Sequence, residues 1–155
     1  MGLRNPFKFA VKPATSLLFI NDVGGQTWEE INWGQRAPIT AGPTTRVPGP
    51  TPSIRRHSTP TGTAAPTPPA ARSRGIFYNP ATVQFPKQYV GKYFFTDLCN
   101  GFIRTYGPAT RAARGFATGL RSVVDLEVSK DGELYYLSYL SSGVRGSVGK
   151  ISYGG

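Results

Sequence analysis

The chain has 155 residues and a formal net charge of +10, with 19 glycines, nine phenylalanines, eight tyrosines and a single cysteine. One cysteine, Cys99, excludes an internal disulfide and a cluster of cysteine metal ligands, and no run of eighteen apolar residues predicts a membrane span. The many glycines and aromatic residues, with little helical periodicity, favour an all-β fold. We expect Cys99 to pack inside such a fold.

Residues 1–34 contain two strand-like runs separated by a turn, followed by a loop with two adjacent glycines. The loop spans Asn21–Gly25, and a short run after it, Trp28–Asn32, is expected to place Ile31 in the core. Five apolar side chains of the two strands are expected to be buried: Phe9, Val11, Leu17, Phe19 and Ile20.

Residues 35–75 differ in composition from both flanks. They hold six arginines, nine of the fourteen prolines and no acidic or aromatic residue. Their large aliphatic side chains are only three, and burying each gains roughly 1.5 to 3 kcal/mol. Ordering the backbone costs on the order of 1 to 2 kcal/mol per residue, so the cost exceeds the gain several-fold. We expect Gln35–Gly75 to be disordered or irregular.

The central part of the chain predicts a second strand–turn–strand unit. Lys92–Asp97 and Gly101–Tyr106 are rich in aromatic residues and are separated by the turn-like Leu98–Asn100. No leading strand is predicted for this unit.

The C-terminal part predicts a three-stranded meander. Apolar and polar residues alternate along Leu126–Ser129, and Lys130–Gly132 supplies a turn in which Gly132 tolerates a positive φ. A second strand follows at Glu133–Ser138 and a third at Gly146–Tyr153.

The first and last units are copies of each other. Arg4–Asp22 aligns with Arg121–Tyr139 at an offset of 117 residues without a gap, which favours an architecture built from repeated sheets. A plain β-sandwich with a chance similarity is the alternative. The aligned apolar pairs are Phe9 with Leu126, Val11 with Val128, Leu17 with Leu134, Phe19 with Tyr136, and Ile20 with Leu137.

Repeated meanders are typical of β-propellers, which need four to eight blades to close. The chain is long enough for two to three blades. We therefore predict a partial propeller, with residues 1–34 as a first blade portion, residues 35–75 as a Pro/Arg/Thr-rich insert, and residues 76–155 as the last one to two blades. Exposed blade edges are expected to promote self-association.

Two groups of residues are candidates for binding. Arg4 and Asn5 precede the first strand, and Arg121 precedes its counterpart, so these side chains can converge on an anionic ligand. Gly24 and Gly25 lie in a loop whose carbonyl oxygens can face a hard cation such as calcium. The alternatives are that the arginines only connect neighbouring loops and that the glycines only form a turn.

The order of several short motifs resembles the C-terminal half of the glucose/sorbosone dehydrogenase family. These are six-bladed propellers that use pyrroloquinoline quinone (PQQ) and calcium to oxidise sugars. The resemblance covers residues 2–33 and 75–153. The motifs are Arg4-Asn5-Pro6, Glu30-Ile31-Asn32, Phe77-Tyr78-Asn79-Pro80, Tyr93–Asp97 with Gly101–Arg104, and Val124-Asp125-Leu126 with Asp131-Gly132.

The resemblance implies roles for the candidate residues. Arg4 and Asn5 match an arginine and an asparagine that contact the quinone, and Arg121 matches an arginine that faces the carboxylates of the cofactor. Gly24 and Gly25 fall where backbone carbonyls hold the calcium. The parent domain would oxidise an aldose or a related sugar alcohol group by hydride transfer to PQQ.

The family's catalytic histidine belongs to a blade that has no counterpart here. The only histidine, His57, lies in the low-complexity segment, so we assign no catalytic residue and expect this chain alone to be inactive. A non-catalytic propeller that binds proteins or glycans is the alternative function. A basic module for polyanions is a third, although the arginine-rich segment has no aromatic residues for stacking and predicts no specific nucleic-acid partner. The resemblance implies a periplasmic or secreted protein, and the sequence printed here shows no signal peptide.

Overall fold

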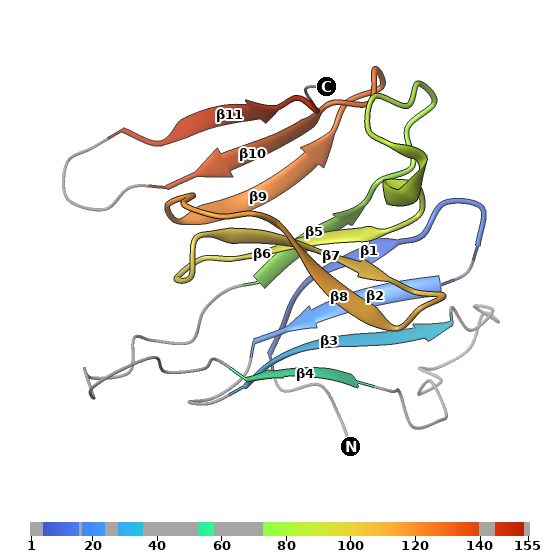
Figure 1. The fold of residues 1–155 in the computed structure, drawn as a ribbon. Coiled ribbons are helices and arrows are strands. Elements are labelled where there is room, and N and C mark those ends of the chain that lie inside the picture. The colour runs from blue at the N-terminus through green and yellow to red at the C-terminus, as the bar shows by residue number, and fades with distance from the viewer. Residues whose placement is uncertain are drawn as a thin grey trace, which may run out of the picture.

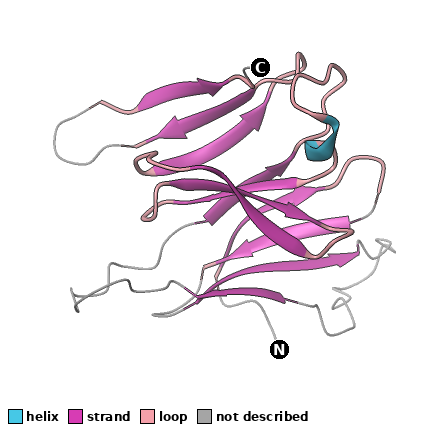
Figure 2. Ribbon diagram, viewed as in Figure 1, coloured by secondary structure: helices cyan, strands magenta, loops and turns pink. Residues whose placement is uncertain are grey.

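A computed structural model describes residues 5–15, 17–23, 28–35, 53–57, 73–139 and 145–153. These residues form an all-β structure of three antiparallel sheets (Figure 1). The only helical element among them is the three-residue 3-10 turn η1 (Lys87–Tyr89), so no helix in this part of the chain could cross a membrane (Figure 2).

The sheets follow one another along the chain, and no closed barrel or ring forms among the described residues. Sheet A has the order β1-β2-β3-β4, sheet B the order β5-β6-β7-β8, and sheet C the order β11-β10-β9. The strands of sheet A are β1 (Pro6–Val11), β2 (Leu17–Asp22), β3 (Trp28–Gln35) and β4 (Ser53–His57). Those of sheet B are β5 (Ser73–Phe77), β6 (Tyr93–Asp97), β7 (Phe102–Gly107) and β8 (Ala112–Ala117). Those of sheet C are β9 (Val123–Val128), β10 (Leu134–Ser138) and β11 (Ser147–Ile151).

The predicted strands are confirmed, and sheet B has two strands more than expected. β5 is the leading strand that the sequence did not indicate, and β8 is a fourth strand whose sequence, AARGFA, shows no alternation of apolar and polar residues. β4 and the first residues of β5 lie within Gln35–Gly75, so these parts of the segment are not irregular. The rest of that segment lies outside the described residues.

The repeat is visible in the strands. β1 and β2 match β9 and β10 at the offset of 117, and each first strand bulges at the same place, at Phe7 and at Val124. The turn between Lys12 and Leu17 has one residue more than the turn between Ser129 and Glu133. β2 is therefore shifted by one residue relative to β10, so that Phe19 corresponds in space to Tyr135 rather than to Tyr136.

Sheet B is the middle layer of a three-layer stack, and both of its faces are covered. Every residue of β6 is buried, because Tyr93 and Phe95 pack toward sheet A while Phe94 packs toward sheet C. A strand that is buried on both faces shows consecutive apolar residues and no alternation of apolar with polar residues. The core between sheets A and B contains Phe19, Ile31, Phe77, Tyr93, Phe95 and Tyr106. The core between sheets B and C contains Tyr78, Phe85, Phe94, Ile103, Val123, Leu126 and Leu134.

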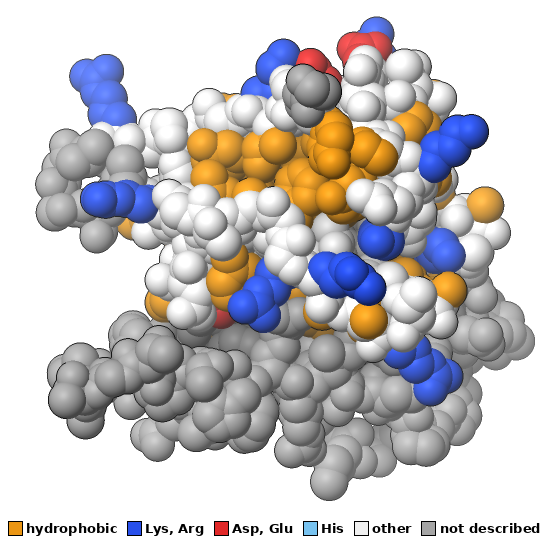
Figure 3. All heavy atoms as spheres, viewed as in Figure 1, with side chains coloured by type: hydrophobic (Ala, Val, Ile, Leu, Met, Phe, Trp, Pro, Cys, Tyr) orange, Lys and Arg blue, Asp and Glu red, His pale blue; other side chains and the backbone are white. Residues whose placement is uncertain are grey.

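The second core approaches the surface at one side. Figure 3 shows hydrophobic side chains gathered over the junction of sheets B and C. The partly buried residues that pack against this core include Phe116 of β8, Tyr136 of β10 and Ile151 of β11.

The leading strands β1, β5 and β9 lie side by side and run in the same direction; we call them the inner strands. Near their beginnings, the Arg74 guanidinium of β5 lies 4.5 Å from the ring centroid of Phe7 in β1. One step further, Lys8 of β1 forms an ion pair with Asp125 of β9. These two residues are themselves separated by 117 positions. The three sheets therefore meet at β1, β5 and β9, and their other strands extend away from these inner strands.

Several side chains expected to be buried are exposed. Phe9, Val11 and Leu137 are 64%, 51% and 43% exposed, whereas the aligned Leu126 is 1% exposed. The prediction for these three residues is wrong because they lie on the outward faces of sheets A and C, which no described part of the chain covers. Cys99 is also exposed, in the turn between β6 and β7, so its predicted packing role is wrong.

Candidate ligand site at the ends of the inner strands

Asn5 is exposed and lies immediately before β1. Its backbone N–H donates to the Asp22 Oδ1 atom at 2.6 Å, and its carbonyl oxygen accepts a hydrogen bond of 2.9 Å from the Val23 N–H. Asp22 and Val23 are buried. The start of β1 is thus fixed against the residue that precedes the glycine pair, while the Asn5 side chain stays available to solvent.

Arg121 is exposed and lies two residues before β9. Because β1 and β9 run in the same direction, Asn5 and Arg121 lie at the same end of the inner strands, which we call the entry end. Arg74 of β5 lies there too and stacks on Phe7. Sequence reasoning missed Arg74 because it belongs to the segment expected to be irregular. The aromatic run Ile76-Phe77-Tyr78 that follows Arg74 is the sequence feature that could have indicated a strand here.

Three of the predicted site residues, Arg4, Gly24 and Gly25, lie outside the described residues. Among the described residues, no group of three or more histidine, cysteine, aspartate or glutamate side chains gathers where it could hold a metal ion. The predicted calcium site thus stays a prediction.

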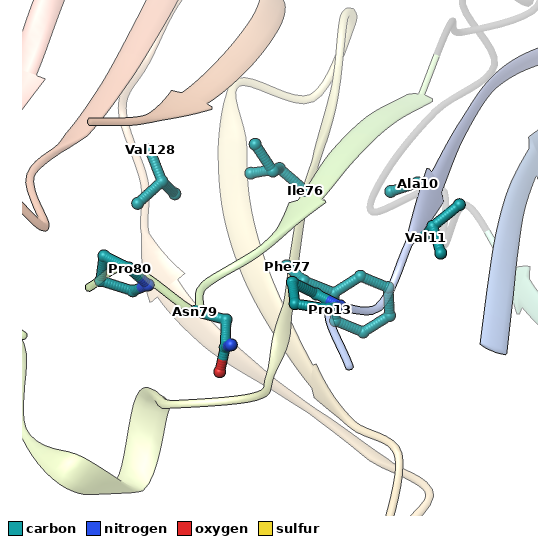
Figure 4. A pocket seen from close by; sticks show the side chains of 8 residues that line it. All are labelled: Ala10, Val11, Pro13, Ile76, Phe77, Asn79, Pro80 and Val128. Atoms are coloured by element: carbon teal, nitrogen blue, oxygen red, sulfur yellow. The ribbon is translucent and has the colours of Figure 1, made fainter. Parts of the chain in front are cut away.

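A pocket of about 260 Å³ lies at the other end of the inner strands (Figure 4). Val11, Phe77 and Val128, the last residues of β1, β5 and β9, all line it. Its lining is mostly apolar, and Asn79 supplies its one polar side chain (Figure 4). The remaining lining residues are Ala10, Pro13, Ile76 and Pro80.

The pocket and the entry end differ in chemistry. The pocket offers apolar surface with a single amide, whereas the entry end offers Asn5, Arg74 and Arg121. A mostly apolar pocket suits an uncharged group, and guanidinium groups suit carboxylates or phosphates. Asn5 and Arg121, the two predicted site residues that the structure describes, therefore lie at the opposite end of the strands from the pocket.

One buried titratable group next to the inner strands, the Tyr93 hydroxyl of β6, has a structural role. Tyr93 is fully buried, and its hydroxyl donates to the Asn21 side-chain oxygen, which joins sheet B to sheet A. Burial raises the pKa of the Tyr93 hydroxyl well above its usual value. A neutral tyrosine that is held in this way acts as a hydrogen-bond donor and is not a general base.

A second polar cluster lies on the outward face of sheet C. The Glu133 carboxylate accepts hydrogen bonds from Lys150 Nζ at 2.8 Å and from the Tyr135 hydroxyl at 3.0 Å. The Lys150 hydrogen bond lowers the pKa of Glu133, and the hydrogen bond to Glu133 raises the pKa of Lys150. These groups pair with one another across strands, so they stabilise the sheet locally.

His57 is remote from both ends of the inner strands. It is the only histidine of the chain and belongs to β4, which is separated from β1 by β2 and β3. At about 4.8 Å between neighbouring strands, β4 lies about 14 Å from β1.

A comparison with protein-family models finds no family that matches this chain, and a comparison with curated proteins finds no match either.

Proposed function

We propose that this chain is a three-sheet part of a β-propeller of the glucose/sorbosone dehydrogenase type, which binds an anionic ligand of the PQQ class at the entry end. The sheets would be three successive blades, and β1, β5 and β9 their innermost strands. Arg4, Asn5 and Arg121 would hold the carboxylates, and Gly24 and Gly25 the calcium. The bound quinone would accept a hydride from a sugar in the parent domain.

The observation that carries this proposal is the common direction of the inner strands. It brings the residues that precede β1 and β9 to one end of the molecule, where Asn5 and Arg121 are exposed. Arg74 lies at the same end and adds a second guanidinium group to that of Arg121 and the amide of Asn5. Several guanidinium groups around one axis are a fitting arrangement for a ligand with several carboxylates.

The described residues fit the binding of the cofactor but not its chemistry. Oxidation of a sugar hydroxyl needs a base to take up the proton, and the described side chains that we assign to the ligand site, Asn5, Arg74 and Arg121, are not bases at neutral pH. Lys8 and Asp125 are engaged with each other. We therefore propose that the chain binds the cofactor and does not oxidise sugars by itself.

The test is a titration of PQQ into the purified chain with and without calcium, followed by absorbance and calorimetry. We expect saturable binding that Arg121→Ala weakens by at least about tenfold, as expected for the loss of a charge-assisted pair. Arg111→Ala is the matched control, because Arg111 is an exposed arginine in the turn between β7 and β8. No reduction of an electron-accepting dye is expected with an aldose.

Other outcomes have defined meanings. Equal losses in Arg121→Ala and Arg111→Ala would show non-specific attraction to a basic chain and contradict the proposed site. No binding by the wild-type chain would favour the second candidate, a non-catalytic module for proteins or glycans. That candidate is supported by the exposed apolar side chains on the outward sheet faces. Salt-sensitive binding of random DNA with no PQQ binding would favour the polyanion module instead.

A further inference from the structure

The backbone around Arg121 is anchored on both sides, although the Arg121 side chain is exposed. On the preceding side, the Leu120 N–H donates a hydrogen bond of 2.9 Å to the Gly101 carbonyl oxygen. On the following side, the Ser122 carbonyl oxygen accepts a hydrogen bond of 2.9 Å from the Tyr139 N–H. Gly101 belongs to the turn between β6 and β7 of sheet B, and Tyr139 directly follows β10 of sheet C. Two different sheets therefore hold the backbone of one exposed arginine.

The contact between Leu120 and Gly101 leaves no room for a side chain at position 101. Gly101 has φ of +58°, and an added Cβ would lie well inside van der Waals contact with the Leu120 carbonyl oxygen. The Leu120 side chain packs against the core between sheets B and C. Leu120 is thus contacted at its N–H, its carbonyl oxygen and its side chain, directly before Arg121.

The turn that carries Gly101 is held by a buried carboxylate. Asp97 is buried, and its Oδ1 atom accepts hydrogen bonds from the Cys99 N–H at 2.8 Å and from the Asn100 N–H at 3.1 Å. Because β6 is antiparallel to β5, this turn lies at the entry end. It therefore gives Leu120 a defined support at the end of the molecule where the ligand is proposed to bind.

Ser122 has a backbone conformation that serine disfavours. Its φ is +44°, in the left-handed region that is unfavourable for a residue with a Cβ. Residues that are held in such a conformation often lie at functional sites. The hydrogen bond from Tyr139 to Ser122 recurs in the sister copy, where the Val23 N–H donates to the Asn5 carbonyl oxygen, also at 2.9 Å. Both inner strands are thus closed by the same bond directly after their candidate arginines.

The sequence before these two strands is repeated as well. Gly119-Leu120-Arg121 is identical to Gly2-Leu3-Arg4 at the offset of 117 residues. In the second copy the leucine is the anchored residue and the arginine the exposed one. Repetition of the pair is expected if an anchored leucine sets the position of each arginine.

We propose that Gly101 and Ser122 are positioning residues for Arg121, which they hold so that its guanidinium group faces the carboxylates of an anionic ligand at the entry end. This inference rests on the proposed function. Within the described part of the chain, the Arg121 side chain has no hydrogen-bond or ion-pair partner, so the anchors fix a side chain that the fold itself does not use. Fixing it before binding raises affinity, because less conformational freedom is lost when the ligand binds.

The first test compares two glycines in matched surroundings. Gly132 also has a positive φ, and an added Cβ there would also meet a backbone carbonyl oxygen, that of Thr82. The Gly132 turn follows β9, however, and lies at the pocket end. Gly101→Ala and Gly132→Ala should both lower the unfolding temperature, but only Gly101→Ala should weaken PQQ binding, by about three- to tenfold. Equal losses of affinity in the two folded variants would overturn the proposal.

Ser122→Gly tests the same idea with a variant that should keep its stability. Glycine adopts a positive φ without strain and also populates other conformations, so the backbone beside Arg121 becomes less restricted. PQQ affinity should fall by about three- to tenfold, while the unfolding temperature should not fall. Ala14→Gly is the control, since Ala14 has φ of +58° in the turn that follows β1 at the pocket end, and it should leave the affinity unchanged. Wild-type affinity in Ser122→Gly would contradict the role of Ser122.

A measurement without ligand separates this inference from the proposed function. Backbone NMR relaxation of the wild-type chain should give the Arg121 amide an order parameter of about 0.85, as in rigid backbone. The value should fall in Gly101→Ala and in Ser122→Gly and stay unchanged in Gly132→Ala. A wild-type value below about 0.6, typical of flexible backbone, would overturn the proposal. A rigid Arg121 in a chain that does not bind PQQ would support the anchoring and contradict the proposed cofactor.

Discussion

Sheets A and C share one sequence pattern, but opposite faces of the two sheets are buried. The face that carries Leu126 and Leu134 is buried in sheet C, and the equivalent face with Phe9 and Leu18 points outward in sheet A. The opposite face is buried at Phe19 in sheet A and outward at Tyr135 in sheet C. Position in the stack, rather than residue type, determines which copy of a side chain contributes to the core.

This difference shows that a sequence repeat predicts which faces of a sheet can pack against other sheets. It does not predict which of these faces are covered. Each sheet has one face suited to the preceding sheet and one suited to the following sheet. Only sheet B, which lies in the middle, has both faces covered within the described chain. The end sheets keep exposed hydrophobic residues, which in soluble proteins often mark an interaction surface.

The largest expected difference is between Leu126→Ala and Phe9→Ala. Leu126 is 1% exposed and Phe9 is 64% exposed, so the first change should lower the free energy of unfolding by about 2–5 kcal/mol and the second by less than about 0.5 kcal/mol. Urea unfolding in dilute, monomeric solution measures both. Similar losses would mean that the outward face of sheet A is covered within one chain.

The two sister turns provide the next contrast. Gly132 has φ of +87°, and an added Cβ would meet the Thr82 carbonyl oxygen well inside van der Waals contact. Gly132→Ala should therefore cost at least about 2 kcal/mol. Ala14 has φ of +58° in an exposed turn, so Ala14→Gly should be neutral or stabilise by up to about 1 kcal/mol. Thermal unfolding compares them, and a costly Ala14→Gly would contradict this account.

A smaller, pH-dependent effect is expected where sheets A and B meet. Burial raises the pKa of Tyr93 in the folded chain, so above about pH 10 the unfolded chain loses this proton while the folded chain keeps it. Stability should then fall with rising pH by up to about 1.4 kcal/mol per pH unit from this group. Tyr93→Phe should remove that part of the alkaline slope, as seen in urea unfolding at pH 9 to 11.

Tyr139→Phe is the control for the alkaline slope, because Tyr139 is 61% exposed. It should leave the slope unchanged. An unchanged slope in Tyr93→Phe would instead mean that the buried tyrosine does not report on the contact between sheets A and B.

The candidate site could be predicted only in part. Arg121 was recognised because it holds the position before β9 that Arg4 holds before β1, and Asn5 because it follows Arg4 directly before that strand. Arg74 and the apolar pocket were missed, because β5 could not be identified in its proline- and arginine-rich surroundings and the pocket needs the ends of three strands at once. The assignment of a sugar dehydrogenase role to these residues stays a prediction.

The sequence by itself determined the paired strands of the two copies, their turns and the repeat, because alternating apolar residues and a glycine with positive φ at Gly132 act over a few neighbouring residues. Only the tertiary structure decided which face of each copy is buried. One extra residue in the turn before Leu17 shifts β2 against its sister strand, and the position of sheet B between the other two decides the rest. Burial depends on what lies across the sheet, and that information is not local.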